Sequence, residues 1–273
     1  MTYIIDWNEI WKLAHSIQPS TSDPWVSRAE HFNKHVERVS KNTDKIISQF
    51  NCKPTDTVLD IGAGPGRYVI PLASQVASVT AIEPSYAMRQ ILESKVEKNE
   101  LTNVVTVPLI WEDITIGKEI EAHDIVIVSH SLTMHDLKEA LIKINQAAKR
   151  DVWIFLFAGN RIDSWIRDVL IKAGKPALSL QDSFDYLIVY SVLHDLEIYA
   201  DINIHTYSYT DTYPDAESAL RDWRLLYDIS PDNEIFTQEI TRRFTRTGDQ
   251  YSLPRTSRTA AIHWRVNSDS HLD

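Results

Sequence analysis

Apolar residues recur at helical intervals in two stretches within the first 53 residues. They are Ile10, Trp11, Ala14 and Ile17 in the first stretch, and Phe32, Val36, Val39, Ile46, Ile47 and Phe50 in the second. Asp6 and Glu9, ahead of the first stretch, have the spacing of a helix capping box, and a turn-rich segment over 19–24 separates the two stretches. The pattern predicts amphipathic helices that form an N-terminal extension over residues 1–53.

From residue 54 the pattern changes to short runs rich in valine and isoleucine, separated by helical segments. The predicted strands are 57–61, 78–82, 104–109, 124–129 and 152–157, and the predicted helices are 66–76, 85–98 and 136–149. Strands and helices that alternate at this spacing form a parallel sheet with helices on both faces. The sequence therefore predicts an α/β fold with a doubly wound, mostly parallel sheet.

The pattern is weaker beyond Gly159. A helix is predicted over 215–226, and its apolar side comprises Ala216, Ala219, Leu220, Trp223 and Leu226. Two strand-like runs, 201–209 and 259–266, are expected to extend the sheet as an antiparallel edge pair. Without an obvious interdomain linker, residues 54–273 are expected to form one domain.

Composition narrows the classes of function. The formal net charge is −10 and no run of Lys and Arg forms a basic stripe, so nucleic acid is not an expected partner. Cys52 is the only cysteine, which excludes an intramolecular disulfide and favours a reducing, cytoplasmic location. The apolar runs are too short to predict a membrane span or a signal peptide. The oligomeric state is left open.

The stretch VLDIGAGPGR, residues 58–67, contains three of the seven glycines, and these three lie within a span of five residues. Gly62, Gly64 and Gly66 come directly after a predicted strand that contains Asp60. Glycine adopts backbone angles that side chains forbid and lets a ligand approach the main chain. Because ligands bind at the carboxyl ends of the strands in an open α/β sheet, this stretch predicts a ligand-binding loop.

Two classes of ligand compete for this loop. The dinucleotide fingerprint G-x-G-x-x-G would place its third glycine at position 67, where the chain has Arg67. The spacing here is D-x-G-x-G-x-G, and in this the chain resembles the class I S-adenosylmethionine-dependent methyltransferases. The resemblance implies a Rossmann-like methyltransferase fold and S-adenosyl-L-methionine as the cofactor. The cofactor-binding residues that it implies in this loop are Asp60, Gly62, Ala63, Gly64 and Gly66.

The run IEPSYAM, residues 82–88, resembles the second cofactor motif of this family. Glu83 ends the second predicted strand, and a carboxylate there can accept hydrogen bonds from both ribose hydroxyls. Pro84 and Met88 belong to the same motif and are included among the cofactor-binding residues. Ser85 is expected to cap the helix that follows.

A third motif is the run VPLIWED, residues 107–113. The resemblance implies an acid that accepts a hydrogen bond from the adenine amino group, and Asp113 is chosen, with Glu112 beside it. Trp111 or Ile114 is expected to flank the adenine ring, although packing in the core is the competing interpretation.

The fourth motif, SHSLTMHD over 129–136, follows the fourth predicted strand and resembles the segment near the transferable methyl group. Ser129 is expected to contact the cofactor. A general base is needed only if the acceptor must lose a proton, and His130 and His135 are the candidates, with ordinary polar histidines as the alternative. The resemblance covers residues 56–157 in order.

The implied reaction is methyl transfer to an unidentified small-molecule or protein acceptor. The N-terminal helices are expected to form a lid, and the residues that either shape the acceptor pocket or pack the helices on the sheet are Trp7, Trp11, Trp25, Arg28 and Phe32. No metal is predicted, because His31 and His35 lack a third ligand in the sequence. An NAD(P)-dependent oxidoreductase and a non-catalytic S-adenosylmethionine-binding protein remain as alternatives.

Overall fold

The computed structural model describes residues 5–15, 23, 25–38, 40–159, 163–175 and 186–266. Residue contacts divide the chain into two compact units. The first consists of Met1–Leu156, Tyr186–Ile204 and Ala260–Asp273, and the second consists of Phe157–Asp185 and His205–Thr259. The second unit is thus formed by two separate segments of the chain.

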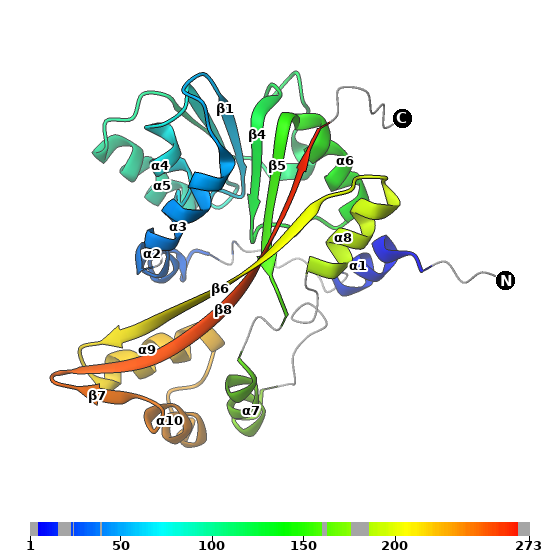
Figure 1. Cartoon of the computed structure of the whole chain (residues 1–273). Helices are drawn as coiled ribbons and strands as arrows, with labels where there is room; N and C mark the ends of the chain where they lie inside the picture. The colour runs from blue at the N-terminus through cyan, green and yellow to red at the C-terminus, as the bar shows by residue number, and fades with distance from the viewer. Residues whose placement is uncertain are drawn as a thin grey trace. The chain divides into compact units, whose positions relative to one another are not determined.

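One eight-stranded sheet has the order β3-β2-β1-β4-β5-β8-β6, with β7 paired to β8 (Figure 1). The strands are β1 Thr57–Ile61, β2 Ser78–Ile82, β3 Val104–Val107, β4 His123–Ser129, β5 Ala148–Phe157, β6 Asp201–Tyr213, β7 Thr245–Thr247 and β8 Gln250–Arg265. The first five strands pair in parallel. This confirms the predicted doubly wound sheet.

Strand β8 runs against the parallel set. Ala158 N–H donates to the carbonyl of Arg258. Val266 N–H donates to the carbonyl of Arg150. Residue numbers therefore rise along β8 from 258 to 266 while those of the paired residues on the β5 side fall from 158 to 150. β8 is therefore antiparallel to β5, and β8 and β6 form the predicted edge pair, with longer strands than the sequence indicated.

The helices are α1 Trp7–His15, α2 Ala29–Arg38, α3 Ser40–Ile47, α4 Val69–Ala73, α5 Tyr86–Lys98, α6 Leu137–Ala147, α7 Ser164–Lys172, α8 Tyr186–Asp195, α9 Ala216–Tyr227 and α10 Glu234–Thr241, with 3₁₀ turns η1 Ser48–Phe50 and η2 Trp111–Asp113. The second N-terminal pattern is thus divided between α2, α3 and η1, and residue 39 lies outside the described residues. Within the described ranges, no helix is long and apolar enough to cross a membrane.

Capping side chains set several helix starts. Asp6 Oδ1 accepts a hydrogen bond from Glu9 N–H at 3.0 Å, as the capping-box spacing predicted. Ser85 Oγ accepts from Met88 N–H at 3.3 Å and begins α5, which confirms the predicted cap. Asp136 caps α6 in the same way.

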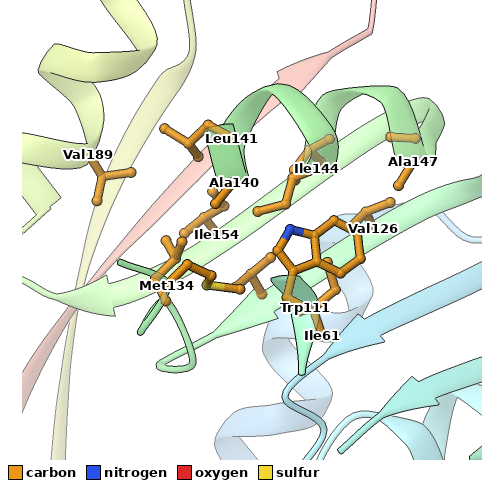
Figure 2. Packing of buried hydrophobic residues seen from close by; sticks show 14 of the residues in the cluster. Ile61, Trp111, Val126, Met134, Ala140, Leu141, Ile144, Ala147, Ile154 and Val189 are labelled. Carbon is orange, nitrogen blue, oxygen red and sulfur yellow. The ribbon is translucent and has the colours of Figure 1, made fainter. Parts of the chain in front are cut away.

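The core of the first unit lies where helices cover the parallel strands. β1 and β4 are buried along almost their whole length because both faces of the sheet are covered. Figure 2 shows part of this core, in which side chains from α6 pack onto the strands. The cluster includes Ile61, Trp111, Val126, Met134, Ala140, Ile144 and Ile154.

Helix α1 is fastened to the segment that leads from β4 into α6. Trp11 is buried, and its indole N–H donates to the carbonyl of Met134 at 2.8 Å. Asn8 Nδ2 donates to Asp136 Oδ1 at 3.1 Å, and Lys12 pairs with the same carboxylate at 2.7 Å. Trp11 therefore packs α1 against the core, and its suggested part in an acceptor pocket stays a prediction.

The second unit has its own core around Trp223 of α9. Arg255 of β8 donates to Asp163 Oδ2 at 3.1 Å and pairs with Asp211 of β6 at 3.5 Å. The guanidinium carbon of Arg255 also lies 5.0 Å from the centroid of the Trp223 ring. One arginine therefore joins two strands, a helix and the residue that precedes α7.

The predicted buried side of α9 is correct at Ala219 and Trp223 and wrong at Leu226. Leu226 is 42% exposed, whereas Tyr227 packs against the core cluster. The buried stripe runs through positions 219, 223 and 227, at intervals of four residues. A stripe at that interval turns position 226 toward solvent.

Candidate functional site

The glycine loop joins β1 to α4 at the carboxyl end of the parallel strands. Gly62, Gly64 and Gly66 have φ angles of +73°, +55° and +84°, a region that L side chains rarely adopt. Gly62 N–H and Ala63 N–H both donate to the carbonyl of Ile82, at 2.8 and 3.0 Å. The loop is therefore fastened to the end of β2.

Two of the three glycines are needed by the packing of the protein itself. A Cβ on Gly62 would lie 2.3 Å from Cβ of Ser131, and a Cβ on Gly66 would lie 2.6 Å from Cδ1 of Leu92. Non-bonded carbon atoms do not approach so closely, so a side chain at either position would force its neighbour to move. Gly62 and Gly66 thus have a structural reason to be glycine.

Gly64 is different. Among the described residues, a Cβ at this position would meet one atom within 4 Å, the Cε1 of Phe32 at 3.9 Å, which is an ordinary contact distance. Internal packing therefore does not exclude a side chain at Gly64. The open space beside its main chain suits the approach of a ligand.

Glu83 bridges the glycine loop and the start of α5. Its Oε2 accepts from Gly64 N–H at 2.7 Å and its Oε1 accepts from Ser85 N–H at 2.8 Å. Burial raises the pKa of Glu83, Asp23 raises it further, and the two amide hydrogen bonds oppose the rise. Each carboxylate oxygen retains a lone pair, so Glu83 can still accept hydrogen bonds from a ligand.

Asp60 lies on β1 and is 1% exposed. Its Oδ2 has no hydrogen-bond partner among the described residues. Burial, followed by repulsion from Glu83, raises the pKa of Asp60 to about 7, and the positive charge of Arg67 opposes the rise. A buried carboxylate without a full set of partners is costly, and a cationic ligand nearby would reduce that cost.

The charges around the loop therefore favour a cation. Asp23, Asp60 and Glu83 contribute negative charge, and Gly64 N–H, which a pyrophosphate would require, already donates to Glu83. Arg67 is the cation beside Asp60, and its Nε donates to Thr43 Oγ1 at 3.0 Å. The arrangement suits a ligand with positive groups and hydroxyl donors better than it suits a polyphosphate.

The chain emerges from β4 in an unusual backbone conformation at His130. This residue has φ of +55°, which is uncommon outside glycine, and its N–H donates to the carbonyl of Phe155 at 2.9 Å. His130 and His135 are both exposed. No group of three His, Cys, Asp or Glu side chains in the described ranges could hold a metal ion.

Two polar residues near the end of β4 were missed by the sequence analysis. Ser131 Oγ donates to the carbonyl of Ile61 at 2.5 Å, which holds this segment against the glycine loop. Tyr68 is 2% exposed and hydrogen-bonds to Ser129. The proximity of Ser129 and Ser131 to the loop follows from the pairing of β1 with β4, which sequence spacing alone does not specify.

The residues of η2 lie in two environments. Trp111 is 3% exposed and packs among side chains of α6 and the strands, as Figure 2 shows, so the core explains its burial without a ligand. Lys143 donates to the carbonyls of Trp111, Glu112 and Ile114 and holds the turn together. The side chains of Glu112 and Asp113 are exposed. Their predicted contacts with adenine stay predictions.

The residues of the second motif, 82–88, also lie partly at the surface and partly in the core. Met88 is 2% exposed and packs inside the protein, whereas Pro84 is exposed beside Glu83. Ala63 is buried in the loop. The structure therefore brings Asp60, the glycine loop and Glu83 together at one edge, while it places Met88 and Trp111 in the interior.

Residues 58–151 match a family model described as a methyltransferase domain. An uncharacterised protein of Haemophilus influenzae is 29% identical over 119 residues, which cover 44% of this chain and 44% of that protein. A mitochondrial ribosomal RNA small subunit methyltransferase of Arabidopsis thaliana is 30% identical over 74 residues, or 27% of this chain and 20% of that protein. The matched region thus spans less than half the length of either curated relative.

The fold is also similar to that of the YcgJ protein from Bacillus subtilis. The two structures superpose with a TM-score of 0.54 at 14% identity, over 81% of this chain and 97% of that one. At this identity the similarity concerns the fold. It agrees with the Rossmann-like arrangement predicted from the sequence.

Proposed function

Because residues 58–151 match the methyltransferase-domain family model, we propose that this protein is a class I S-adenosylmethionine-dependent methyltransferase with a small-molecule or protein acceptor. The proposal extends to the whole chain what the family match covers only in part. The cofactor supplies a methyl group that its positive sulfonium has already activated. The chain must bind and orient the two substrates and exclude water.

The open space beside Gly64 is the observation that carries the proposal. Packing and positive φ angles both favour glycine at positions 62 and 66, whereas at Gly64 only the φ of +55° does, and the described residues leave space there for a ligand. Glu83 lies at the same point, with lone pairs that suit the vicinal hydroxyls of a ribose.

The same site disfavours an NAD(P)-dependent oxidoreductase. A dinucleotide places its pyrophosphate on main-chain amides of this loop, and its charge would lie among the carboxylates of Asp23, Asp60 and Glu83. S-adenosylmethionine carries a sulfonium and an ammonium group, for which these carboxylates are suitable neighbours.

His130 is the better of the two candidates for a general base. It follows β4 directly, and its backbone has the strained conformation that is frequent at functional sites. His135 lies in the segment before α6 and has a negative φ. Either imidazole would hold the acceptor proton only if the acceptor must lose one.

Calorimetry with S-adenosylhomocysteine and, separately, with NADH tests the class of cofactor. We expect S-adenosylhomocysteine to bind and NADH not to bind. Gly64→Val should abolish binding while the protein still unfolds cooperatively, because the new side chain occupies the open space. Gly248→Val is a matched control, since Gly248 has φ of +61° and no neighbouring atom within 4 Å of its Cβ position. NADH binding in place of S-adenosylhomocysteine would refute the proposal.

Methyl transfer from isotopically labelled S-adenosylmethionine into a host-cell extract tests catalysis. Labelled product should form with the wild-type protein and not with Gly64→Val, and the product would identify the acceptor. If S-adenosylhomocysteine binds but no fraction of the extract is labelled, the non-catalytic cofactor-binding alternative becomes the better explanation.

A further inference from the structure

Helix α2 lies directly beside the glycine loop. Among the described residues, Phe32 supplies the atom nearest to the Cβ position of Gly64, and Trp25 packs on Phe32 with ring centroids 5.1 Å apart. The Phe32 side chain is only partly buried. An aromatic face thus borders the same space that a ligand of Gly64 would enter.

Lys95 of α5 joins α2 to the loop. Its Nζ donates to Asn33 Oδ1 at 2.5 Å and to the carbonyl of Pro65 at 3.1 Å, and it lies 3.8 Å from Glu37 Oε1. Asn33 is adjacent to Phe32 on α2, and Pro65 lies between Gly64 and Gly66. One ammonium group therefore links the residue next to Phe32 to the residue next to Gly64.

A second polar contact fastens the segment that leads into α2. Ser85 Oγ donates to Asp23 Oδ2 at 2.7 Å, while Asp23 Oδ1 accepts from Trp25 N–H at 2.9 Å. Ser85 is also the residue whose N–H donates to Glu83. The N-terminal segment is thus attached to both loops that form the candidate site.

We propose that Phe32 is a cofactor-contacting residue that closes the site over Gly64, and that Lys95 is the positioning residue that holds it there. The inference rests on the proposed function and assigns Phe32 to the cofactor instead of the acceptor. An acceptor-pocket residue would not need a tether to the glycine loop. Lys95 provides that tether through Asn33 and the carbonyl of Pro65.

The test is a double-mutant cycle on S-adenosylhomocysteine binding, measured by calorimetry on the full chain. Phe32→Ala should weaken binding roughly tenfold, the size of a lost aromatic contact. Lys95→Met, which keeps the aliphatic stem, should weaken it several-fold. The double variant should bind like Phe32→Ala alone, because Lys95 acts through Phe32. Glu37→Gln is the control, since its amide oxygen can still accept from Asn33 Nδ2, as Glu37 Oε1 does at 3.1 Å, while the long ion pair with Lys95 is lost, and it should bind like wild type.

Amide hydrogen exchange without ligand gives a second measurement. Lys95→Met should exchange faster than wild type in α2, and Glu37→Gln should not. If wild type fails to bind S-adenosylhomocysteine, the proposed function fails. If wild type binds and Phe32→Ala binds equally well, the proposed function stands and this inference is overturned. Losses that multiply in the double variant, or unchanged exchange in α2 of Lys95→Met, would overturn the positioning role of Lys95.

Discussion

Asp56 and Asp60 lie four residues apart at opposite ends of β1, and both are almost fully buried. Arg150 binds Asp56 through two hydrogen bonds of 2.9 and 2.8 Å, and Lys53 N–H donates to the same carboxylate. The hydrogen bonds from Arg150 lower the pKa of Asp56, although burial opposes this. Asp60 Oδ2 has no hydrogen-bond partner among the described residues, and burial raises the pKa of Asp60 to about 7. The same residue type is neutralised by the protein at one end and left unsatisfied at the other.

The amino end of the sheet continues as a closed network. Arg150 also donates to Asp151 at 2.7 Å, and His263 bonds to the other oxygen of Asp151 at 2.9 Å. His263 in turn stacks on Trp153 with ring centroids 4.0 Å apart. The carboxylates of Asp56 and Asp151 thus both have partners within the chain, and these contacts stabilise that end of the sheet. At the carboxyl end, the unsatisfied Oδ2 of Asp60 marks a place where a ligand could complete the interactions.

Removing Arg150 should have one of the two largest effects on stability. Arg150→Met leaves Asp56 buried without its bidentate partner, and we expect the free energy of unfolding to fall by about 3 kcal/mol. Chemical denaturation measures this loss. Lys118→Met, which breaks an exposed ion pair with Glu119, should leave the stability close to that of wild type. An Arg150 variant as stable as wild type would mean that the network does not stabilise the fold.

The glycine loop also contains one position set by internal packing, Gly62, and one that is not, Gly64. Gly62→Ala places a Cβ against Ser131 at a positive φ, and we expect a loss of about 2–4 kcal/mol of stability. Gly64→Ala has only the backbone cost, about 1 kcal/mol, because its Cβ meets Phe32 at an ordinary distance. Thermal unfolding of the two variants distinguishes them. Equal losses would show that Gly64 is also a packing position.

Asp60 and Asp56 should affect stability in opposite directions as the pH changes. The raised pKa of Asp60 means that the folded state holds its proton more tightly than the unfolded state, so stability falls as pH rises from about 4 to about 7. The lowered pKa of Asp56 contributes stability that is present above the unfolded pKa and lost as the pH falls through the folded pKa.

Asp60→Asn isolates the first of these effects. Relative to this variant, wild type should lose roughly 2–3 kcal/mol of unfolding free energy between pH 5 and pH 7, at about 1.4 kcal/mol per pH unit, and no more above pH 8. Denaturant titrations of both proteins across this range give the difference. A difference that does not vary with pH would show that Asp60 is ionised throughout and has a partner.

The sequence predicted the parallel strands, the edge pair and the glycine loop because each depends on local pattern. β1 and β2 begin and end where the valine-rich runs do. The contacts that distinguish Gly62 from Gly64 come from residues far away in the sequence. Ser131 packs against Gly62, Phe32 lies beside Gly64, and Glu83 accepts a hydrogen bond from Gly64 N–H. The position of Trp111 could not be predicted, because an aromatic residue in a cofactor motif looks the same in sequence whether it faces a ligand or, as here, the core.

The smallest predicted effect on stability concerns His130. Glycine adopts φ of +55° without the strain that a side chain brings, so His130→Gly should raise the unfolding free energy by up to about 1 kcal/mol. His135 has a negative φ, and His135→Gly should lower it slightly through the added freedom of the unfolded chain. If His130 is the base, the more stable variant is also the one that loses methyl transfer, by about 100-fold in kcat. Denaturation and single-turnover assays on both variants measure the two quantities. If the strain at His130 serves function, His130→Gly should raise the stability and lower the activity, whereas His135→Gly should not. If His130→Gly neither stabilises the protein nor slows methyl transfer, His130 is an ordinary polar residue of the surface.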